Sequence, residues 1–200
     1  MALRDLIDGG VVTVIFPFGS IEHQSGHLPL GADSVLADAV GVEVAERLEA
    51  VLAPTLGVGC AEEYEGLPGT LTLRAETLTA VAVELAQSFA GQGFRVVVLL
   101  STHGGNRGAL DAAVAELGRS LHGALACAPQ GDVGPNPGQH SGAWMTSVML
   151  ALRPDLVDLD RADPDLRTEL QTANPAQGHA SLERFIASIV ADVRSATTSQ

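Results

Sequence analysis

Histidine and carboxylate side chains gather in a few glycine-rich segments of this sequence. Imidazole and carboxylate groups that converge on one point are what a divalent transition metal requires. Zn²⁺, Mn²⁺ or Fe²⁺ held there would acidify water and polarise a substrate carbonyl, so the expected chemistry is metal-assisted hydrolysis. The residues concerned are His23, His27, His103, His140, Glu22, Asp33, Glu62, Glu63 and Glu65.

The first segment, FPFGSIEHQSGHLPLGADS (16–34), contains Glu22, His23, His27 and Asp33 within 12 residues. Its glycines and proline exclude a regular helix or strand. Asp33 has an alternative role as the N-cap of the helix that follows. His27 has an alternative role as a hydrogen-bonding group that holds the loop. Glu22 follows a buried strand, where an acid is costly unless it is paired or bound.

The second segment, LLSTHGGNRG (99–108), places His103 at the exit of an apolar strand. Gly104 and Gly105 follow, and two further interpretations of them stay open. They could allow a tight turn into the next helix, or they could let a phosphate approach the helix N-terminus. The usual glycine spacing of a phosphate-binding loop is absent.

The third segment, GQHSGAWMTSVML (138–150), contains His140 just before a helical pattern. This histidine could act as an acid–base group or bind substrate. Trp144 is a candidate substrate contact and, alternatively, a packing residue. A serine triad built on Ser101 or Ser141 lacks a nucleophile-elbow sequence.

Short apolar runs alternate with helical patterns along the chain, which predicts an α/β fold with a mainly parallel sheet covered on both faces. In such sheets ligands bind at the carboxyl ends of the strands, which is where the three segments fall. We expect one domain over 1–200, with an N-terminal helix in 1–10 and a frayed tail at 196–200. The expected strands are 11–16, 51–56, 94–101 and 124–128, and the expected helices are 34–50, 75–92, 106–121, 141–152 and 182–193.

The net charge of −13 argues against nucleic acid and against an anionic membrane surface as partners. All 11 basic residues are arginine, so lysine-dependent Schiff-base and P-loop chemistry is excluded. No apolar run is long enough for a membrane span, and MALRDLIDGG lacks the apolar stretch of a signal peptide. Cys60 and Cys127 form no CxxC motif and are expected to be free thiols, so we expect a cytoplasmic protein.

Four ordered motifs resemble the creatininase (creatinine amidohydrolase) family. They are GSIEHQSGHLPLGAD (19–33), LPGTLTL (67–73), STHGGN (101–106) and HSGAWMTSVMLALRPDLV (140–157). The resemblance implies a three-layer Rossmann-like sandwich and a homo-oligomer, either a hexamer or a smaller assembly. It also implies metal-dependent hydrolysis of a C–N bond in a small, frequently cyclic, amide substrate.

Carried over by position, the resemblance implies that Glu22, Asp33 and His103 are metal ligands, with Asp33 as the bridging one. Three positions depart from the family pattern. Gln24 occupies a ligand-histidine position, with His23 beside it as a further candidate ligand. Both Met145 and Gly105 stand where the pattern has glutamate. Because methionine cannot replace a carboxylate for such cations, we expect one ion per chain, or none, rather than two.

The resulting hypothesis is a metal-dependent amidohydrolase acting on a small amide or lactam, in which His140 protonates the leaving nitrogen. The predicted catalytic residues are His140, Glu22 and His103, and the predicted substrate-binding residues are Gln24, His27, Gly104, Gly105 and Trp144. Two alternatives remain: a non-hydrolytic isomerase or cyclase that uses the same pocket, and a catalytically silent subunit that stabilises a partner.

Overall fold

Four parallel strands form one sheet in the order β2-β1-β3-β4 in the computed structural model, which describes residues 3–121, 125–128 and 139–198. The central pair, β1 and β3, runs in register from Thr13 opposite Val96 to Phe18 opposite Ser101. Their carboxyl ends therefore lie level at one edge of the sheet. The strands are β1 (Thr13–Phe18), β2 (Val51–Leu52), β3 (Val96–Ser101) and β4 (Leu125–Cys127).

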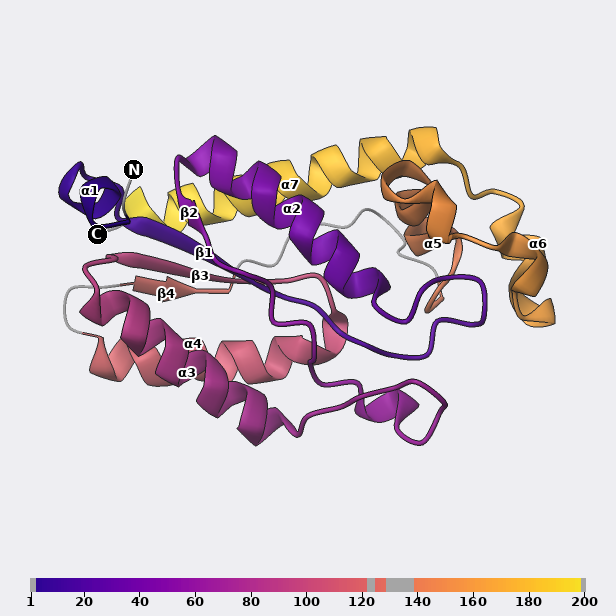
Figure 1. The fold of residues 1–200 in the computed structure, drawn as a ribbon, viewed down its shortest axis with the longest axis horizontal. Coiled ribbons are helices and arrows are strands. Elements are labelled where there is room, and N and C mark those ends of the chain that lie inside the picture. The colour runs from indigo at the N-terminus through magenta and orange to yellow at the C-terminus, as the bar shows by residue number, and fades with distance from the viewer. Residues whose placement is uncertain (1–2, 122–124, 129–138, 199–200) are drawn as a thin grey trace.

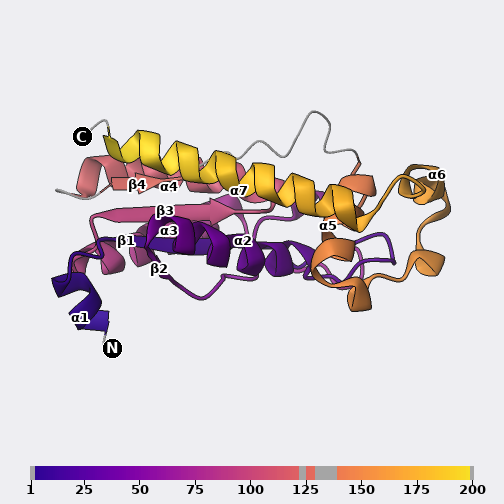
Figure 2. The ribbon, with the colours of Figure 1, turned by 90° about the horizontal axis from the view of Figure 1, so that it is seen from above.

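Helices cover both faces of this sheet, as Figures 1 and 2 show. Helices α3 and α4 lie on one face, and α2, α5 and α7 lie on the other. This arrangement confirms the predicted three-layer α/β sandwich. The helices are α1 (Leu3–Asp8), α2 (Ala32–Leu48), α3 (Ala75–Gly91), α4 (Arg107–Ser120), α5 (Ala143–Leu152), α6 (Arg167–Leu170) and α7 (Pro175–Thr198), with 3₁₀ turns η1 (Glu62–Tyr64), η2 (Gly104–Asn106), η3 (Pro154–Leu156), η4 (Leu159–Arg161) and η5 (Pro164–Leu166).

The continuous apolar runs of β1 and β3 arise because both faces of these strands are buried. On β1, Val14 and Phe16 pack toward α3 and α4, whereas Ile15 packs toward α2 and α7. Leu99 and Leu100 of β3 divide between the two faces in the same way. Each such side chain contributes about 1.5–3 kcal/mol by leaving water. The two best-packed strands thus form a rigid base for the loops at their carboxyl ends.

The strand order places those loops at a topological switch point. From β1 the chain passes through α2 to β2, and from β2 it returns through α3 to β3 on the other side of β1. The connections after β1 and β3 therefore diverge onto opposite faces of the sheet, which leaves a crevice at the carboxyl ends of these two strands. None of the described helices is long and apolar enough to span a membrane.

The start of α2 differs from the prediction in a way that affects the site. The helix begins at Ala32 rather than at Ser34, and its N-cap is Gly31, which makes no side-chain capping bond. Asp33 therefore lies inside the first turn, and its interpretation as a capping residue is wrong. The negative charge still suits the positive end of the helix dipole. Its side chain is free to point toward the loop after β3.

Other boundaries shift for local reasons. The predicted strand 51–56 keeps only Val51–Leu52 and an isolated bridge at Leu56, because Pro54 has no N–H to continue the ladder. Helix α7 is longer than predicted and reaches Thr198, so residues 196–198 of the expected frayed tail are helical. Residues 129–138, 199 and 200 lie outside the described residues.

Candidate metal centre

Three side chains from three segments meet at the carboxyl ends of β1 and β3. Glu22 comes from the loop after β1, Asp33 from the first turn of α2, and His103 from the residues after β3. One potential ligand atom from each lies within 4.8 Å of the others, and all three residues are buried. His103 Nδ1 is 3.2 Å from Glu22 Oε2 and 3.9 Å from Asp33 Oδ2. The structure thus brings together the three predicted ligands.

The orientation of the His103 ring is fixed by its other nitrogen. His103 Nε2 lies 2.7 Å from the backbone carbonyl oxygen of Cys60, to which it donates its proton. In the neutral ring this tautomer leaves the Nδ1 lone pair facing the two carboxylates, as a metal-ligating imidazole requires. Gly105 makes this contact possible, because a Cβ at that position would overlap the Cys60 oxygen and lie 2.6 Å from His103 Nε2.

The two carboxylates are buried close to one another, which is costly without a counter-charge. Glu22 Oε2 accepts a hydrogen bond of 2.8 Å from Ser20 Oγ. Burial raises the pKa of Asp33 well above its ordinary value, and the nearby charge of Glu22 adds to the rise. A bound divalent cation would favour both ionised carboxylates and so offset this cost.

Gln24 joins Asp33 to the start of α5. Its Nε2 donates to Asp33 Oδ2 at 3.2 Å, and its Oε1 accepts from Ser141 Oγ at 2.8 Å. Because a carboxylate can only accept, the amino group of Gln24 must face Asp33. Gln24 also lines the cavity, and one N–H of its amide is directed at Asp33.

His140 stands beside this group with its own ring fixed on two sides. Its Nε2 donates to the backbone oxygen of His23 at 2.7 Å, and its ring stacks on Tyr64 with centroids 4.1 Å apart. This leaves Nδ1, 3.6 Å from Glu22 Oε1, as the nitrogen that can exchange a proton near the carboxylates. His140 therefore occupies the position that an acid–base residue needs.

These residues line a cavity of about 290 Å³. Gly104, Gly105 and Trp144, which were predicted to bind substrate, lie in its wall. The indole N–H of Trp144 is buried and has no hydrogen-bond partner among the residues described. The described lining residues are Glu22, Gln24, Asp33, Glu63, Thr102, His103, Gly104, Gly105, Gln139, His140, Ser141, Trp144 and Met145.

The charges of this wall also decide between the two interpretations of the glycine pair. Three carboxylates and no arginine are found among the described lining residues. A phosphate group would therefore meet repulsion rather than a counter-charge. We conclude that Gly104 and Gly105 serve the turn and the approach to Cys60, and that the phosphate interpretation is not supported.

Two predicted residues lie elsewhere. His27 does not line the cavity: its ring nitrogens lie 3.2 Å from the Ser25 carbonyl oxygen and 2.9 Å from Thr146 Oγ1, and the side chain is fully buried. Its predicted role in substrate binding is therefore replaced by the alternative of holding the loop. The His23 ring is not part of the three-residue group, and His23 contributes instead a backbone oxygen to His140.

Asn106 is a residue of this centre that sequence analysis did not single out. It is fully buried, donates to the Gly19 carbonyl at 3.0 Å, and accepts from the Cys60 amide at 2.8 Å. It thereby ties the chain after β1 to the segment that orients His103. The motifs contain Asn106, Ser20 and Ser141. Their hydrogen-bond partners could not be predicted, because the sequence spacing of a hydroxyl or amide side chain does not indicate which group it will contact.

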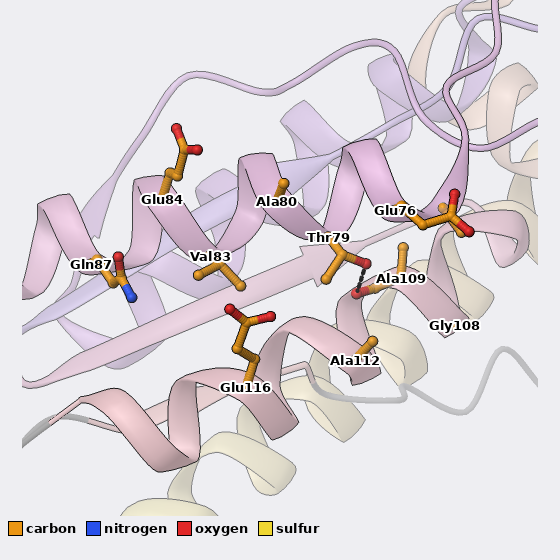
Figure 3. Close-up of a pocket in the computed structure, with 11 residues that line it drawn as sticks. Glu76, Thr79, Ala80, Val83, Glu84, Gln87, Gly108, Ala109, Ala112 and Glu116 are labelled. Carbon is orange, nitrogen blue, oxygen red and sulfur yellow. Dashed lines mark hydrogen bonds between the residues drawn. The ribbon is translucent and has the colours of Figure 1, made fainter.

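A second concavity, of about 680 Å³, lies between α3 and α4, the two helices that cover one face of the sheet. Figure 3 shows Glu116 extending from α4 toward α3, whereas Glu84 on α3 points away from α4. Thr79 Oγ1 donates to the Ala109 carbonyl at 3.0 Å and joins the two helices. No histidine or cysteine lines this groove among the described residues, so it does not supply the mixed ligand set that the first cavity contains.

The donor types and their mutual distances are suited to a divalent cation. A nitrogen and two carboxylate oxygens from three separate segments are the ligands of a catalytic zinc or manganese site that keeps open positions. Glu22, Asp33 and His103 form the only such group within the described ranges of the chain.

Comparison with known proteins agrees with this arrangement. The sequence profile of the family described as creatininase, creatinine amidohydrolase, matches residues 2–199. A mycofactocin precursor peptide peptidase of Mycolicibacterium smegmatis is 36% identical over 75% of this chain and 62% of its own length. The chain thus spans under two thirds of that relative.

Two further relatives are creatininases by name. The creatinine amidohydrolase of Pseudomonas putida is 30% identical over 78% of this chain and 70% of its own length. A solved mutant creatininase, described as of Zn–Zn type, superposes with a TM-score of 0.77 at 26% identity, covering 96% of this chain and 93% of that one. The motifs, the fold and these relatives agree, and the chain belongs to the creatininase family.

Proposed function

We propose that this chain is a metal-dependent amidohydrolase that cleaves a C–N bond of a small amide or lactam. The observation that carries the proposal is the convergence of Glu22, Asp33 and His103, with the Nδ1 of the imidazole directed at both carboxylates. A cation held by these residues would supply a Lewis acid and acidified water.

The remaining groups of the cavity have complementary roles. Glu22, held by Ser20, can accept a proton from attacking water through its Oε1, which lies on the side of His140. His140 carries a proton on Nδ1 when its ring is charged and delivers it to the leaving nitrogen. The Cys60 carbonyl keeps the His103 ring in place throughout.

The cavity supports a small substrate. Its volume of about 290 Å³ is at the lower end of the range for small-molecule sites. The acidic wall favours a neutral or cationic amide over an anionic one. Two of the relatives are named a creatinine amidohydrolase and a precursor peptide peptidase, and both names describe amide hydrolysis. A peptide end is therefore the competing substrate class.

The test is a metal-dependent hydrolysis assay. Protein stripped with a chelator is reloaded with Zn²⁺ or Mn²⁺ and incubated with 2-pyrrolidinone, creatinine, simple primary amides and a short unblocked peptide, and amine or acid release is followed by mass spectrometry. We expect turnover of a small amide or lactam only after reloading. Equal turnover by stripped protein would contradict the proposal, and turnover of the peptide alone would replace its substrate class.

Turnover in this assay excludes the alternative of a silent subunit, and His140→Ala then tests the acid–base role of this histidine. Loss of turnover with unchanged Zn²⁺ affinity supports the acid–base role, since His140 is outside the ligand group. Unchanged turnover would remove His140 from the mechanism. The expected homo-oligomer stays a prediction, which sedimentation velocity can test.

A further inference from the structure

Gln24 occupies the side of Asp33 that faces α5, and its amide is held at both ends. Ser141 Oγ donates to the amide oxygen at 2.8 Å, and the amide nitrogen donates to Asp33 Oδ2 at 3.2 Å. All three side chains belong to buried residues. Rotation of the amide would direct its oxygen at a carboxylate and leave the Ser141 hydroxyl without its acceptor.

This chain of hydrogen bonds has a direct electrostatic consequence. The Asp33 oxygen that receives the Gln24 amino group, Oδ2, is also the one that lies 3.9 Å from His103 Nδ1. An N–H with partial positive charge therefore occupies the lone pair through which Oδ2 could bridge to a second cation. A cation placed there would also lose the amide oxygen as a ligand, because that oxygen is turned toward Ser141. Met145, which also lines the cavity, offers only a thioether, which is a poor ligand for Zn²⁺ or Mn²⁺.

The backbone at Ser141 supports the same orientation. Ser141 has a φ of +57°, in the left-handed region that non-glycine residues rarely adopt. Its carbonyl oxygen accepts from Thr146 Oγ1 at 3.3 Å, which ties it to the first turn of α5. The hydroxyl is therefore presented to Gln24 from a fixed helix end rather than from a mobile loop.

We propose that the Ser141–Gln24–Asp33 chain limits this metal centre to one cation, unlike the solved relative that is described as of Zn–Zn type. The inference concerns only how many ions the centre holds, and it rests on the metal binding that the proposed function requires. Gln24 is in this account a positioning residue, because it acts on Asp33 and not on substrate.

The decisive experiment replaces the amide by a carboxylate of the same shape. In Gln24→Glu the donor to Asp33 is lost and two oxygens become available beside it. Stripped wild-type protein and variant are titrated with Zn²⁺ by calorimetry, and bound zinc is counted by native mass spectrometry. We expect one ion per chain in the wild type and two in the variant.

The matched control is Gln139→Glu. Gln139 lines the same cavity and is exposed, so the substitution adds the same charge without touching the hydrogen-bonded chain. We expect it to keep one ion. A second ion in Gln139→Glu would show that added charge alone recruits zinc, and this would overturn the inference.

Ser141→Ala keeps the test decisive if the additional buried carboxylate prevents folding. Without the hydroxyl, the Gln24 amide can turn and offer its oxygen, so a second, weaker binding event is expected. The inference is wrong if the wild type binds two ions or if neither variant gains one. Wild-type protein that binds no zinc at all would instead contradict the proposed function.

Discussion

The groove between α3 and α4 is larger than the cavity at the carboxyl ends of β1 and β3, with about 680 Å³ against about 290 Å³. Glutamates line both regions, but only the smaller one contains histidines among the described residues. In the groove the carboxylates of Glu76 and Glu84 belong to exposed residues, whereas in the cavity Glu22 and Asp33 are buried.

The difference lies in how each region is made. The groove is the space between two neighbouring helices. It is open because many of the side chains that line it are those of alanine, which are small. The cavity is made by segments that follow different strands and are tied together by buried polar contacts of Asn106 with Gly19 and Cys60. A reactive site is therefore indicated by the burial of charged side chains from separate segments, and not by the volume of the cavity.

The largest expected effect is the loss of metal binding in Glu22→Gln. The variant keeps the shape but removes a charged ligand, so Zn²⁺ affinity should fall by more than the roughly 10–100-fold that loss of an outer-shell partner costs. Calorimetry measures this, and hydrolysis should fall with it. The same substitution in the groove, Glu84→Gln, should change neither quantity. An equal loss in both variants would break the distinction between the two regions.

A neighbouring pair of glycines tests the cavity wall itself. In Gly105→Ala the new Cβ meets the Cys60 oxygen and His103 Nε2, so the ring must move away from the carboxylates. We expect Zn²⁺ affinity to fall roughly 10–100-fold and stability to fall by about 1–3 kcal/mol. In Gly104→Ala nothing lies within 4 Å of the new Cβ, and zinc affinity should stay unchanged. Similar losses in both would show that the Cys60 contact does not orient His103.

The cost of buried charge is tested by Asp33→Asn. Burial and the charge of Glu22 raise the folded-state pKa of Asp33 above its unfolded value. Such a carboxyl does not oppose folding at low pH, where both states are protonated, but it destabilises the metal-free fold as the pH rises from the unfolded pKa through the folded one. At neutral pH the metal-free variant should therefore melt a few °C higher than metal-free wild type.

This advantage of Asp33→Asn should vanish below the ordinary pKa of an aspartate, and added Zn²⁺ should stabilise only the wild type. Thermal unfolding with and without zinc, followed across this pH range, measures both effects. A variant that is less stable than metal-free wild type at neutral pH would mean that Asp33 is already compensated without a cation.

The smallest effect is expected in the groove. Thr79→Val removes the hydroxyl that donates to the Ala109 carbonyl and keeps the shape of the side chain. The free energy of unfolding should fall by about 0.5–1.5 kcal/mol, while zinc affinity stays constant. Urea denaturation and calorimetry measure the two quantities. A change in zinc affinity would reveal coupling between the groove and the metal centre through the sheet.

Sequence alone predicted the fold well because its signals are local. The apolar runs at 11–16 and 94–101 lie on the central strands, since a strand buried on both faces needs such a run. The boundaries shifted where a tertiary contact dominates. Asp33 lies inside a helix that it was expected to cap, and α7 continues to Thr198 with Val193 still buried.

The site was only partly predictable. The motifs identified the residues that the structure brings together, Glu22, Asp33 and His103, and placed His140 beside them. They could not show that His27 turns away from the cavity, because its two partners are a loop carbonyl and Thr146 on α5, 119 residues away. The contact of His103 with the backbone oxygen of Cys60 could not be predicted from residue types, because every residue carries such an oxygen.

The central claim, that three residues distant in sequence share one cation, is tested most directly by anomalous scattering. Crystals of the protein grown with Zn²⁺ would be measured on both sides of the zinc absorption edge. We predict a single difference peak per chain, bounded by Glu22, Asp33 and His103 Nδ1. An absent peak, or one that lies only among the glutamates between α3 and α4, would contradict the account.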